Sequence, residues 1–552
     1  MNKFDNILSF AKANWLNLIP SINDMNVLKV GTDKIDNIKA IIYCNPKLLS
    51  CIGQSNNNLR SNSIVYYESI NDVPLATFDL IIVDESKYLI TAKSFSSYRK
   101  ILIKLYTVLK SDGVILLCLP DNIGYLKYRY WTKKVLSEMA FKWMSYYFCD
   151  PSSEYPFKIS QYSKSTKWLV EQLPNVKIRH TTIKESLRNF LKNIVFKITD
   201  IYNPFRGLIV LTGNSALPIT CNDNLKTILT NYCKGAEAEK QIKPFFIYLA
   251  SINLLKQYVF IYNELNSNLL LVVKIGYKLP GRIGDVRQEY ENLLAINICR
   301  EILKRRNIII PEALGFESYA HIGKDFTVQS GVPGISISSI MDRYIRQGKR
   351  EDIYRILNEI VNILIYLQEV YAKETVNSEV STISSAYFNN YKSISFSGKD
   401  AATYLNQVQH GDFAANNIYF DISTNEWGII DWEWMAKGFP PLFDTFSFFT
   451  SIRFIKNSKA YNNEFDKYYL SFIHTYFSKN WFSDYLKILF ERYCNLSQID
   501  KRFVFSYFLK YLLFNCNKYR LYYKLPQYQY LYEKMLNYAV TNKNDFIYQG
   551  KE

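Results

Sequence analysis

Three polar residues in the C-terminal third of the chain have the types and the spacing that phosphoryl transfer uses. His410 and Asp412 stand in the tripeptide His-Gly-Asp, and Asn417 follows after four intervening residues, in the pattern H-G-D-x-x-x-x-N. Transfer of a phosphoryl group from a nucleotide needs a base that orients the attacking hydroxyl, oxygen ligands for the metal and a cation that neutralises charge. A carboxylate and an amide in this order are candidates for the first two requirements.

The residues after Asn417 predict a hairpin that ends in a second carboxylate. Residues 417–420 have the composition of a short strand, 421–425 that of a turn, and 427–430 that of a second strand. Such a hairpin returns Asp431 to the side of Asn417. Mg²⁺ prefers oxygen ligands and shares its coordination shell with phosphates and water, so an amide and a carboxylate on neighbouring strand ends suit it.

Two further motifs accompany this pattern. The residues Ile-Asp-Trp-Glu occupy positions 430–433, and positions 438–444 approximate the motif G-x-P-x-x-D with one extra residue. Together with H-G-D-x-x-x-x-N, they resemble the aminoglycoside phosphotransferase and choline kinase-like family, whose members are relatives of the protein kinases. The resemblance covers the C-terminal half of the chain and implies a bilobal, protein-kinase-like α+β fold there.

The resemblance also implies a role for each of the polar residues. Asp412 is expected to be the catalytic base, and His410 is expected to orient it. Asn417 and Asp431 are expected to be the ligands of Mg²⁺. The alternative is a polar turn between two strands in which His410 is accommodated in the core. The complete set of motifs in this order favours the kinase interpretation.

A kinase-like fold also needs a lysine that pairs with the nucleotide phosphates and a glutamate that holds it. Lys274 lies near the end of an apolar strand, where the family places this lysine. The stretch 285–303 has helical spacing, and either Glu289 or Glu291 could hold the lysine. Glu289 is preferred because Leu293 lies one turn later on the same face. The alternative is a surface lysine with two solvated glutamates.

A strand that runs into a Gly/Pro turn, at 326–334, lies where the two lobes of such a fold are hinged. Backbone groups of Ser330 and Val332 are expected to contact the adenine there. The Gly-rich loop that covers the phosphates is poorly represented, because 252–263 contains no glycine. ATP and Mg²⁺ are the expected cofactors.

The N-terminal part of the chain has a different pattern. Residues 26–214 alternate short apolar strands with helical stretches, which predicts a doubly wound α/β domain. Strands are expected at 27–30, 40–43, 64–67, 80–83 and 114–119, and a helix at 95–109. The segments 78–84, 108–117 and 205–211 resemble the fourth strand, a strand entry and the closing strand of the class I S-adenosylmethionine-dependent methyltransferases.

The cofactor signature of that second family is incomplete in this chain. The family has a Gly-rich turn after the first strand, where the backbone must approach the ligand closely. Gly31 is the single glycine of that turn here, and Lys29 stands where an acid is usual. The predicted second strand ends near Asn45 instead of at an acid that could hold the ribose. Gly31, Asn45 and Asp84 remain candidate contacts to S-adenosylmethionine, but the combined losses favour a degenerate, structural domain.

The composition indicates a folded protein of two or more domains. The 552 residues carry a formal net charge of +17, but the lysines are scattered, so most are expected to be solvated surface. Nine cysteines without a Cys-x-x-Cys pair argue against zinc ribbons and a disulfide framework. The chain shows neither a signal-peptide pattern nor an apolar run of roughly 18 residues. These features predict a cytoplasmic protein and leave peripheral membrane contact open.

The net positive charge could serve a nucleic acid, an anionic membrane surface or phosphorylated substrates. The tyrosine-rich stretch 519–532 could form a platform on which bases stack. Aromatic packing between helices explains the same tyrosines more simply. A nucleic-acid partner is therefore not expected.

The expected organisation is a methyltransferase-like domain at 1–215, a connector at 216–245, a kinase-like N-lobe at 246–332 and a C-lobe at 333–552. The favoured function is an ATP-dependent phosphotransferase that acts on a hydroxyl of a small molecule or a saccharide. One alternative is a bifunctional methyltransferase-kinase. The other is a non-catalytic scaffold, which the missing Gly-rich loop favours and the intact acidic residues and asparagine oppose.

Overall fold

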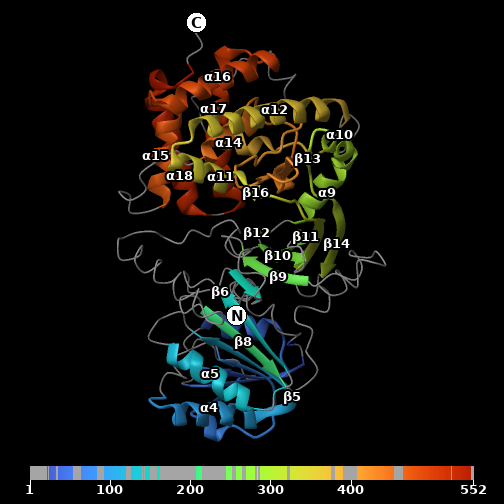
Figure 1. Cartoon of the computed structure of the whole chain (residues 1–552), viewed down its shortest axis with the longest axis vertical. Coiled ribbons are helices and arrows are strands. Elements are labelled where there is room, and N and C mark those ends of the chain that lie inside the picture. The colour runs from blue at the N-terminus through green and yellow to red at the C-terminus, as the bar shows by residue number, and fades with distance from the viewer. Residues whose placement is uncertain are drawn as a thin grey trace. The chain divides into compact units, whose positions relative to one another are not determined.

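The structure is a computed structural model of the whole chain (Figure 1). It describes Ile22, Phe141 and residues 24–32, 35–53, 64–83, 92–119, 126–139, 143–149, 158–161, 207–213, 244–250, 256–263, 269–279, 282–283, 286–319, 324–374, 380–388, 407–452, 464–523 and 525–548. The chain forms two compact units. The first unit comprises 1–171, 180–284 and 319–324, and the second comprises 172–179, 285–318 and 325–552.

The centre of the first unit is a parallel sheet in the order β3-β2-β1-β4-β5. Its strands are β1 (Asn26–Val30), β2 (Leu48–Ile52), β3 (Ile64–Tyr67), β4 (Phe78–Val83) and β5 (Leu109–Leu119). Most residues of β1, β2 and β4 are buried, as expected for parallel strands that are covered on both faces. The strands predicted at 27–30, 64–67, 80–83 and 114–119 are confirmed.

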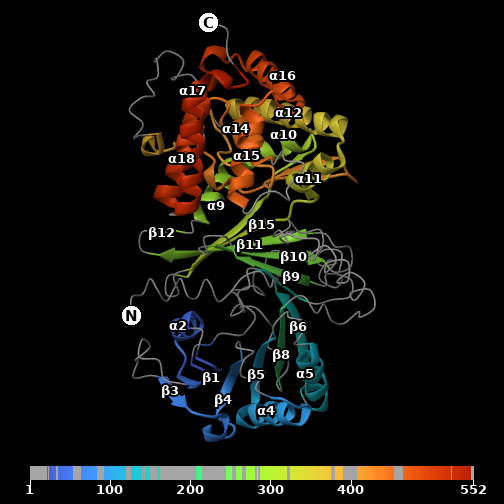
Figure 2. The ribbon, with the colours of Figure 1, turned by 90° about the vertical axis from the view of Figure 1, so that its left-hand side faces the viewer.

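Helices cover both faces of this parallel sheet. The helices are α2 (Ile35–Tyr43), α4 (Phe95–Val108) and α5 (Leu126–Glu138). From the junction of β1 and β4 the strand order proceeds in opposite directions, and right-handed crossovers then place the connecting helices on opposite faces. Figure 2 shows α2 on one side of these strands and α4 with α5 on the other. The predicted doubly wound α/β fold is confirmed.

One predicted strand of this domain is wrong. Residues 40–43 are the last turn of helix α2, and the second strand is β2, five residues further along the chain at Leu48–Ile52. Ile38 and Ile41 are both fully buried and are spaced by three residues, so they form one face of a helix. A short apolar run does not distinguish a strand from a buried helix segment by itself.

The same sheet continues beyond β5 with antiparallel strands. They are β8 (Gly207–Gly213), β6 (Trp143–Cys149), β7 (Lys158–Gln161), β9 (Pro244–Ala250), β10 (Lys256–Asn263) and β11 (Leu269–Leu279), in this order, and β12 (Arg282–Ile283) pairs with β11. Strand β8 lies between β5 and β6, which confirms the predicted closing strand. The predicted connector lies almost entirely outside the described residues, and the predicted domain limits stay predictions.

The second unit contains mixed α and β elements before its hairpin. They are α9 (Arg287–Ala295), η6 (Asn297–Cys299), α10 (Arg300–Lys304), β13 (Ile308–Ile309), β14 (Ala313–Tyr319), β15 (Lys324–Ser330), β16 (Ile335–Ser336), α11 (Ile337–Gln347) and α12 (Arg350–Glu374). The single helix expected at 285–303 is interrupted by η6. Cys299 and Ile296 are fully buried at this interruption, and both belong to the core of the unit.

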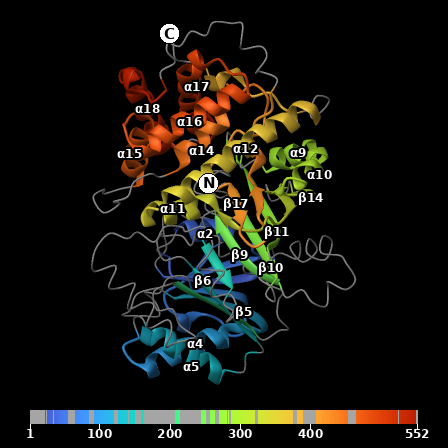
Figure 3. The same cartoon turned by 45° about the horizontal axis from the view of Figure 1, so that its top comes forward.

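A hairpin and a helical layer complete the second unit. The hairpin strands are β17 (Ile418–Asp421) and β18 (Glu426–Ile429), followed by η9 (Trp432–Trp434). The layer consists of α14 (Phe443–Ser451), α15 (Glu464–Tyr476), α16 (Trp481–Leu496), η11 (Lys501–Phe503), α17 (Val504–Asn517), the π-helix η12 (Lys518–Tyr522), α18 (Pro526–Thr541) and η13 (Lys543–Asp545), and η8 (Ser385–Phe388) precedes the hairpin. Figure 3 shows α12 beside α14 and α16.

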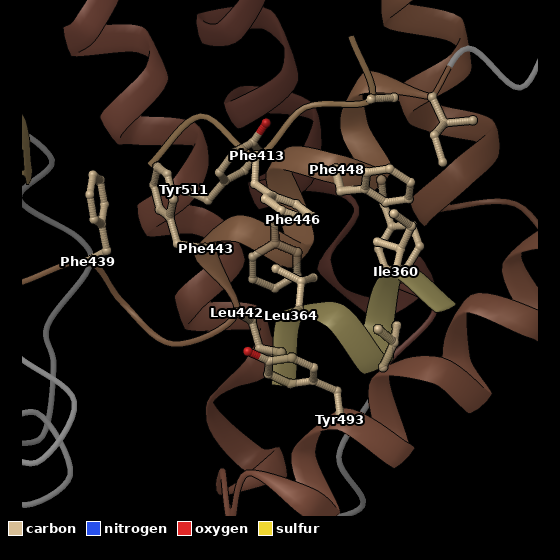
Figure 4. Packing of buried hydrophobic residues seen from close by; sticks show 14 of the residues in the cluster. Ile360, Leu364, Phe413, Phe439, Leu442, Phe443, Phe446, Phe448, Tyr493 and Tyr511 are labelled. Atoms are coloured by element: carbon tan, nitrogen blue, oxygen red, sulfur yellow. The ribbon is translucent and has the colours of Figure 1, made fainter. Parts of the chain in front are cut away.

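The core of this layer is largely aromatic. Figure 4 shows Phe446 of α14 among other rings, facing the aliphatic side chains of α12. Its ring centroid lies 5.1 Å from that of Phe508 and 5.4 Å from that of Phe490. In the tyrosine-rich stretch 519–532, Tyr519 stacks on Tyr528 and Tyr532, so these rings pack against one another. None of the described helices is long and apolar enough to cross a membrane.

Candidate active site

The predicted hairpin is confirmed, and it places the ends of its two strands together. Strands β17 and β18 pair antiparallel with Ile418 opposite Ile429, and the N–H of Ile430 donates to the carbonyl of Asn417 at 2.9 Å. Asp431 therefore leaves the hairpin next to Asn417. Its backbone is left-handed, with φ 69° and ψ 58°, a conformation that is uncommon for a residue other than glycine and that aspartate tolerates better than most.

The loop that carries Asp412 is fixed at its beginning by a buried carboxylate. Asp444, in the first turn of α14, accepts the N–H of His410 through Oδ2 at 2.8 Å and the N–H of Gly411 through Oδ1 at 2.9 Å. Gly411 has φ 76°, and a Cβ atom there would lie 2.3 Å from the backbone oxygen of Trp434. Only glycine fits this turn, because the obstructing atom belongs to the backbone.

The hydrogen bonds of His410 define the state of its ring. Nε2 lies 3.1 Å from the carbonyl oxygen of Ile430, which can only accept, so Nε2 carries the proton. The N–H of Asp412 donates to Nδ1 at 3.3 Å, so Nδ1 is the acceptor. A neutral imidazole with its proton on Nε2 therefore links the loop before Asp412 to the strand end before Asp431.

Burial controls the charge of both supporting groups. It lowers the pKa of His410 to about 4, because a charged imidazolium is poorly solvated in the core. It also raises the pKa of Asp444 to about 7, although the two N–H groups that donate to this side chain favour the carboxylate. Both shifts in pKa favour the neutral form of the side chain.

Asn417 has its amide oriented by the loop. Its Nδ2 donates to the backbone oxygen of Asp412 at 2.9 Å and lies 3.5 Å from Asp412 Oδ2. Because both of these atoms are acceptors, the nitrogen is assigned to that side and Oδ1 faces the other way. Oδ1 accepts from Asn416 Nδ2 at 2.9 Å.

The donor atoms at this position fit Mg²⁺ bound together with a nucleotide. Asn417 offers Oδ1, and Asp431 offers a carboxylate on the adjacent strand end. Mg²⁺ commonly takes one or two protein oxygens and completes its octahedron with phosphate oxygens and water. In the described part of the chain, no cluster of three or more His, Cys, Asp or Glu side chains could hold a metal without such help.

Helix α9 contacts the same segment from another direction. Glu289, the predicted partner of the phosphate-binding lysine, is buried on α9 with 1% of its surface exposed. Asn292, three residues further on, donates Nδ2 to the backbone oxygens of Trp432 at 2.7 Å and Glu433 at 3.2 Å. The helix that carries Glu289 is therefore bonded directly to the residues that follow Asp431.

Lys274 lies in the first unit, in the centre of β11, opposite Tyr258 of β10. Its side chain is 3% exposed, and its Nζ lies 5.4 Å from the centroid of the Tyr258 ring. Because Glu289 belongs to the second unit, the predicted ion pair between Lys274 and Glu289 stays a prediction. Its alternative, a lysine on the surface, is wrong, because Lys274 is buried.

The predicted adenine contacts lie at the end of strand β15 in the second unit: Ser330 is its last residue, and Val332 follows it. The N–H of Ser330 donates to the carbonyl of Glu312 at 3.0 Å, and its Oγ accepts the N–H of Glu312 at 2.8 Å. Because the N–H of Ser330 is already bonded to Glu312, the predicted backbone contact of Ser330 with the adenine would be made by its carbonyl oxygen. Val332 is buried and contacts the hairpin so closely that a Cβ atom on Gly428 would lie 1.9 Å from Val332 Cγ1.

Of the candidate cofactor contacts of the first unit, Asp84 lies outside the described residues, and Gly31 and Asn45 lie at opposite ends of the parallel strands. Gly31 follows β1 with φ 94°, and its N–H donates to the carbonyl of Ile52 at 3.0 Å. Asn45 precedes β2, and its carbonyl accepts the N–H of Asp24 at 3.3 Å, just before β1 begins. In a parallel sheet these are opposite ends, so the reason for selecting Asn45, its place after the second strand, no longer holds.

Lys29 lies in β1, one residue from its end, and its side chain reaches the turn in which the methyltransferase-like signature is incomplete. Its side chain is completely buried, and Nζ donates to the carbonyl of Val30 at 3.2 Å and to that of Gly31 at 3.0 Å. The ammonium group thus lies against the backbone of the turn that would have to approach a cofactor. The degeneration of the cofactor site stays a prediction.

One residue of the active-site region was missed in the sequence. Lys518, at the start of η12, has its Nζ 3.3 Å from Asp412 Oδ1 and is 2% exposed. It lies far downstream of the motifs, among many other lysines. No local pattern distinguishes it, and tertiary packing alone brings it to Asp412.

No family model and no curated protein matches the chain. Similar solved structures include the bifunctional kinase-methyltransferase WbdD, with 13% identity, 90% of this chain and 88% of that chain covered, and a TM-score of 0.21. They also include aminoglycoside phosphotransferase APH(4)-Ia in a thermostable mutant form, with 12% identity, 53% of this chain and 94% of that chain covered, and a TM-score of 0.29.

A Sulfolobus solfataricus protein assigned as a type 11 methyltransferase is also similar, with 10% identity, 35% of this chain and 85% of that chain covered, and a TM-score of 0.18. Structures of both kinds of protein that the sequence resembles are therefore among those similar to this chain. At these identities and TM-scores the comparisons transfer neither a substrate nor an activity.

Proposed function

We propose that the protein is an ATP-dependent phosphotransferase that acts on a hydroxyl group of a small molecule or a saccharide. The observation that supports this proposal is the connected arrangement of Asp412, Asn417 and Asp431. The amide of Asn417 bonds to the backbone of Asp412, and the backbone of Asn417 bonds to the residue before Asp431. One loop and one hairpin thereby hold the proposed base and the two proposed metal ligands.

In the proposed reaction, Asp412 accepts a hydrogen bond from the acceptor hydroxyl and orients it toward the γ-phosphate. His410 and Asp444 keep the loop in place, because one bonds to the backbone of Asp412 and the other holds the two residues before it. Mg²⁺, held by Asn417 and Asp431, would neutralise charge on the β- and γ-phosphates.

Four residues outside the loop complete the proposed nucleotide site. Lys274 would pair with the phosphates, with Glu289 holding it. Backbone groups of Ser330 and Val332 would contact the adenine.

We further propose that the protein works in the cytoplasm on a diffusible acceptor, in keeping with its composition.

The test is a thermal-shift titration of the full chain with Mg²⁺ and ATP, because it needs no knowledge of the acceptor. A ligand that binds only the folded state stabilises it by about 2.7 kcal/mol at 100 times its Kd. We expect a saturable increase in the melting temperature of the wild type that requires Mg²⁺. The increase should disappear in Asp431→Ala, which lacks one of the two proposed ligands.

Asp421→Ala is the matched control, because Asp421 lies on the same hairpin at its turn end, where Oδ1 accepts the N–H of Ser423. This variant should keep the shift. A wild type that shows no shift with millimolar Mg-ATP or Mg-GTP would contradict the proposal and favour the non-catalytic scaffold.

A further inference from the structure

A π-helix joins the last two long helices of the second unit. α17 ends at Asn517, and the π-helix η12 continues directly as Lys518–Tyr522, before α18 begins at Pro526. π-helical turns are rare and are frequent at functional sites, because the wider turn changes the direction of side chains that an α-helix would place elsewhere. Here the first residue of the wider turn is Lys518.

Lys518 is a buried lysine whose charged end lies against the proposed catalytic base. Nζ is 3.3 Å from Asp412 Oδ1, and the side chain is 2% exposed, against 31% for Asp412. Nζ also lies 4.5 Å from the centroid of the Trp434 ring and 5.6 Å from that of Tyr523. A buried ammonium group needs a compensating partner, and a carboxylate with two aromatic faces supplies one.

The last residue of the π-helix, Tyr522, and the residue after it, Tyr523, are bonded to the segment that follows Asp431. The hydroxyl of Tyr522 donates to Glu433 Oε1 at 2.9 Å, and Nε1 of Trp434 donates to the hydroxyl of Tyr523 at 3.0 Å. Both partners on the other side belong to η9. These hydrogen bonds hold the backbone at Lys518 beside the loop and the hairpin. Lys518 therefore differs from a surface lysine, whose side chain moves freely.

We propose that Lys518 is a positioning residue for phosphoryl transfer, acting through Asp412. This inference rests on the proposed function. Lys518 holds Oδ1 of Asp412, so that Oδ2 is directed to the acceptor hydroxyl. In the transfer step the acceptor oxygen forms a bond to the γ-phosphorus, and the bond from that phosphorus to the β,γ-bridging oxygen breaks with its electron pair leaving on ADP. The hydroxyl proton passes to Asp412 Oδ2.

The positive charge of Lys518 does not change in this step. It lies beside the carboxylate of Asp412, which orients the acceptor oxygen toward the phosphoryl group. A fixed charge there requires no reorganisation during the reaction, which is what makes preorganised groups effective. Misplacement of a reacting group by about 1 Å can cost roughly 100-fold in rate.

The experiment uses full-length protein with water as the acceptor, so that ATP hydrolysis is followed over hours in the presence of Mg²⁺. Lys518→Met keeps the length and the apolar contact of the side chain with Trp434 but removes its charge. We expect a decrease in kcat of about 10- to 100-fold, with the KM for ATP and the Mg-ATP thermal shift unchanged. Lys518→Arg should recover part of the rate because it restores a donor to Asp412.

Two further variants separate this role from a structural one. Lys510→Met is the matched control, because Lys510 is a partly buried lysine on the preceding helix α17, and it should keep the wild-type rate. In an Asp412→Asn background, Lys518→Met should cause no further decrease, because residues that act through one another are not additive.

Each result has a defined meaning. A Lys518→Met variant with wild-type kcat, or one that loses as much rate in the Asp412→Asn background as in the wild type, would overturn the positioning role and leave the proposed function standing. A wild type that neither binds Mg-ATP nor hydrolyses it faster than Asp412→Asn would overturn the proposed function, and the role of Lys518 with it.

Discussion

At the level of single residues, the loop before Asp412 is stabilised by two buried groups with displaced pKa values. His410 has a pKa lowered to about 4, and Asp444 has a pKa raised to about 7, both because of burial. Between these values both side chains are neutral in the folded protein, whereas in the unfolded chain they titrate normally. The two groups therefore affect the pH dependence of stability in opposite directions.

The opposite directions lead to a prediction for two single variants. The folded state binds fewer protons at His410 than the unfolded chain from about pH 4 to 6.5, so the stabilising contribution of His410 grows with pH and is complete above that window. The folded state binds more protons at Asp444 from about pH 4 to 7, so its contribution falls over that window and is constant above it. The maximum slope for either group is about 1.4 kcal/mol per pH unit.

Urea unfolding between pH 4.5 and 8 measures these contributions as differences from the wild type. The difference in the free energy of unfolding between the wild type and His410→Gln should increase up to about pH 6.5. The corresponding difference between the wild type and Asp444→Asn should decrease up to about pH 7. The asparagine also replaces one acceptor of the N–H groups by a donor, which costs about 1 to 3 kcal/mol at every pH. Two differences that do not change with pH would contradict the prediction.

At the level of elements, local patterns predicted most of what the structure contains, and the failures have identifiable causes. The hairpin around Asp421 was predictable, because a polar turn separates two short apolar strands and both are local features. The helix at 40–43 was not, because its apolar residues are adjacent and fit either structure. Lys518 was not predictable either, since its position depends on packing between segments far apart in the sequence.

The close contact between the segment after β15 and the hairpin gives a prediction at this level. A Cβ atom on Gly428 would lie 1.9 Å from Cγ1 of Val332, so Gly428→Ala should destabilise the protein by about 1 to 3 kcal/mol. Adding Val332→Ala removes the obstructing atom. The double variant should therefore be more stable than the sum of the single changes predicts, by about 1 kcal/mol or more.

Gly348→Ala is the control for backbone effects. Gly348 has φ 69°, and no heavy atom lies within 4 Å of a Cβ atom built there. Its substitution should cost about 1 kcal/mol through the left-handed backbone, and Val332→Ala should not relieve it. If both glycine variants respond to Val332→Ala in the same way, the contact with Val332 is not the cause. Denaturant unfolding of the single and double variants provides the measurement.

At the level of the whole molecule, the two units differ in the arrangement of the residues that were expected to bind ligands. In the second unit, the loop and the hairpin hold Asp412, Asn417 and Asp431 in one connected arrangement. In the first unit, the sheet order and the helices on both faces follow the predicted fold, but the turn after β1 is occupied by the ammonium group of Lys29. A fold can persist after its original site has changed, because packing and ligand binding depend on different residues.

This difference predicts how the full chain responds to the two cofactors. S-adenosylmethionine at millimolar concentration should not raise the melting temperature, because a bound ligand must approach a backbone turn to which Lys29 is already bonded. Mg-ATP, added to the same preparation, should raise it by mass action and serves as the positive control. A saturable shift with S-adenosylmethionine would instead mean that Lys29 moves or takes part in binding, and the bifunctional methyltransferase-kinase would then become the better description of the protein.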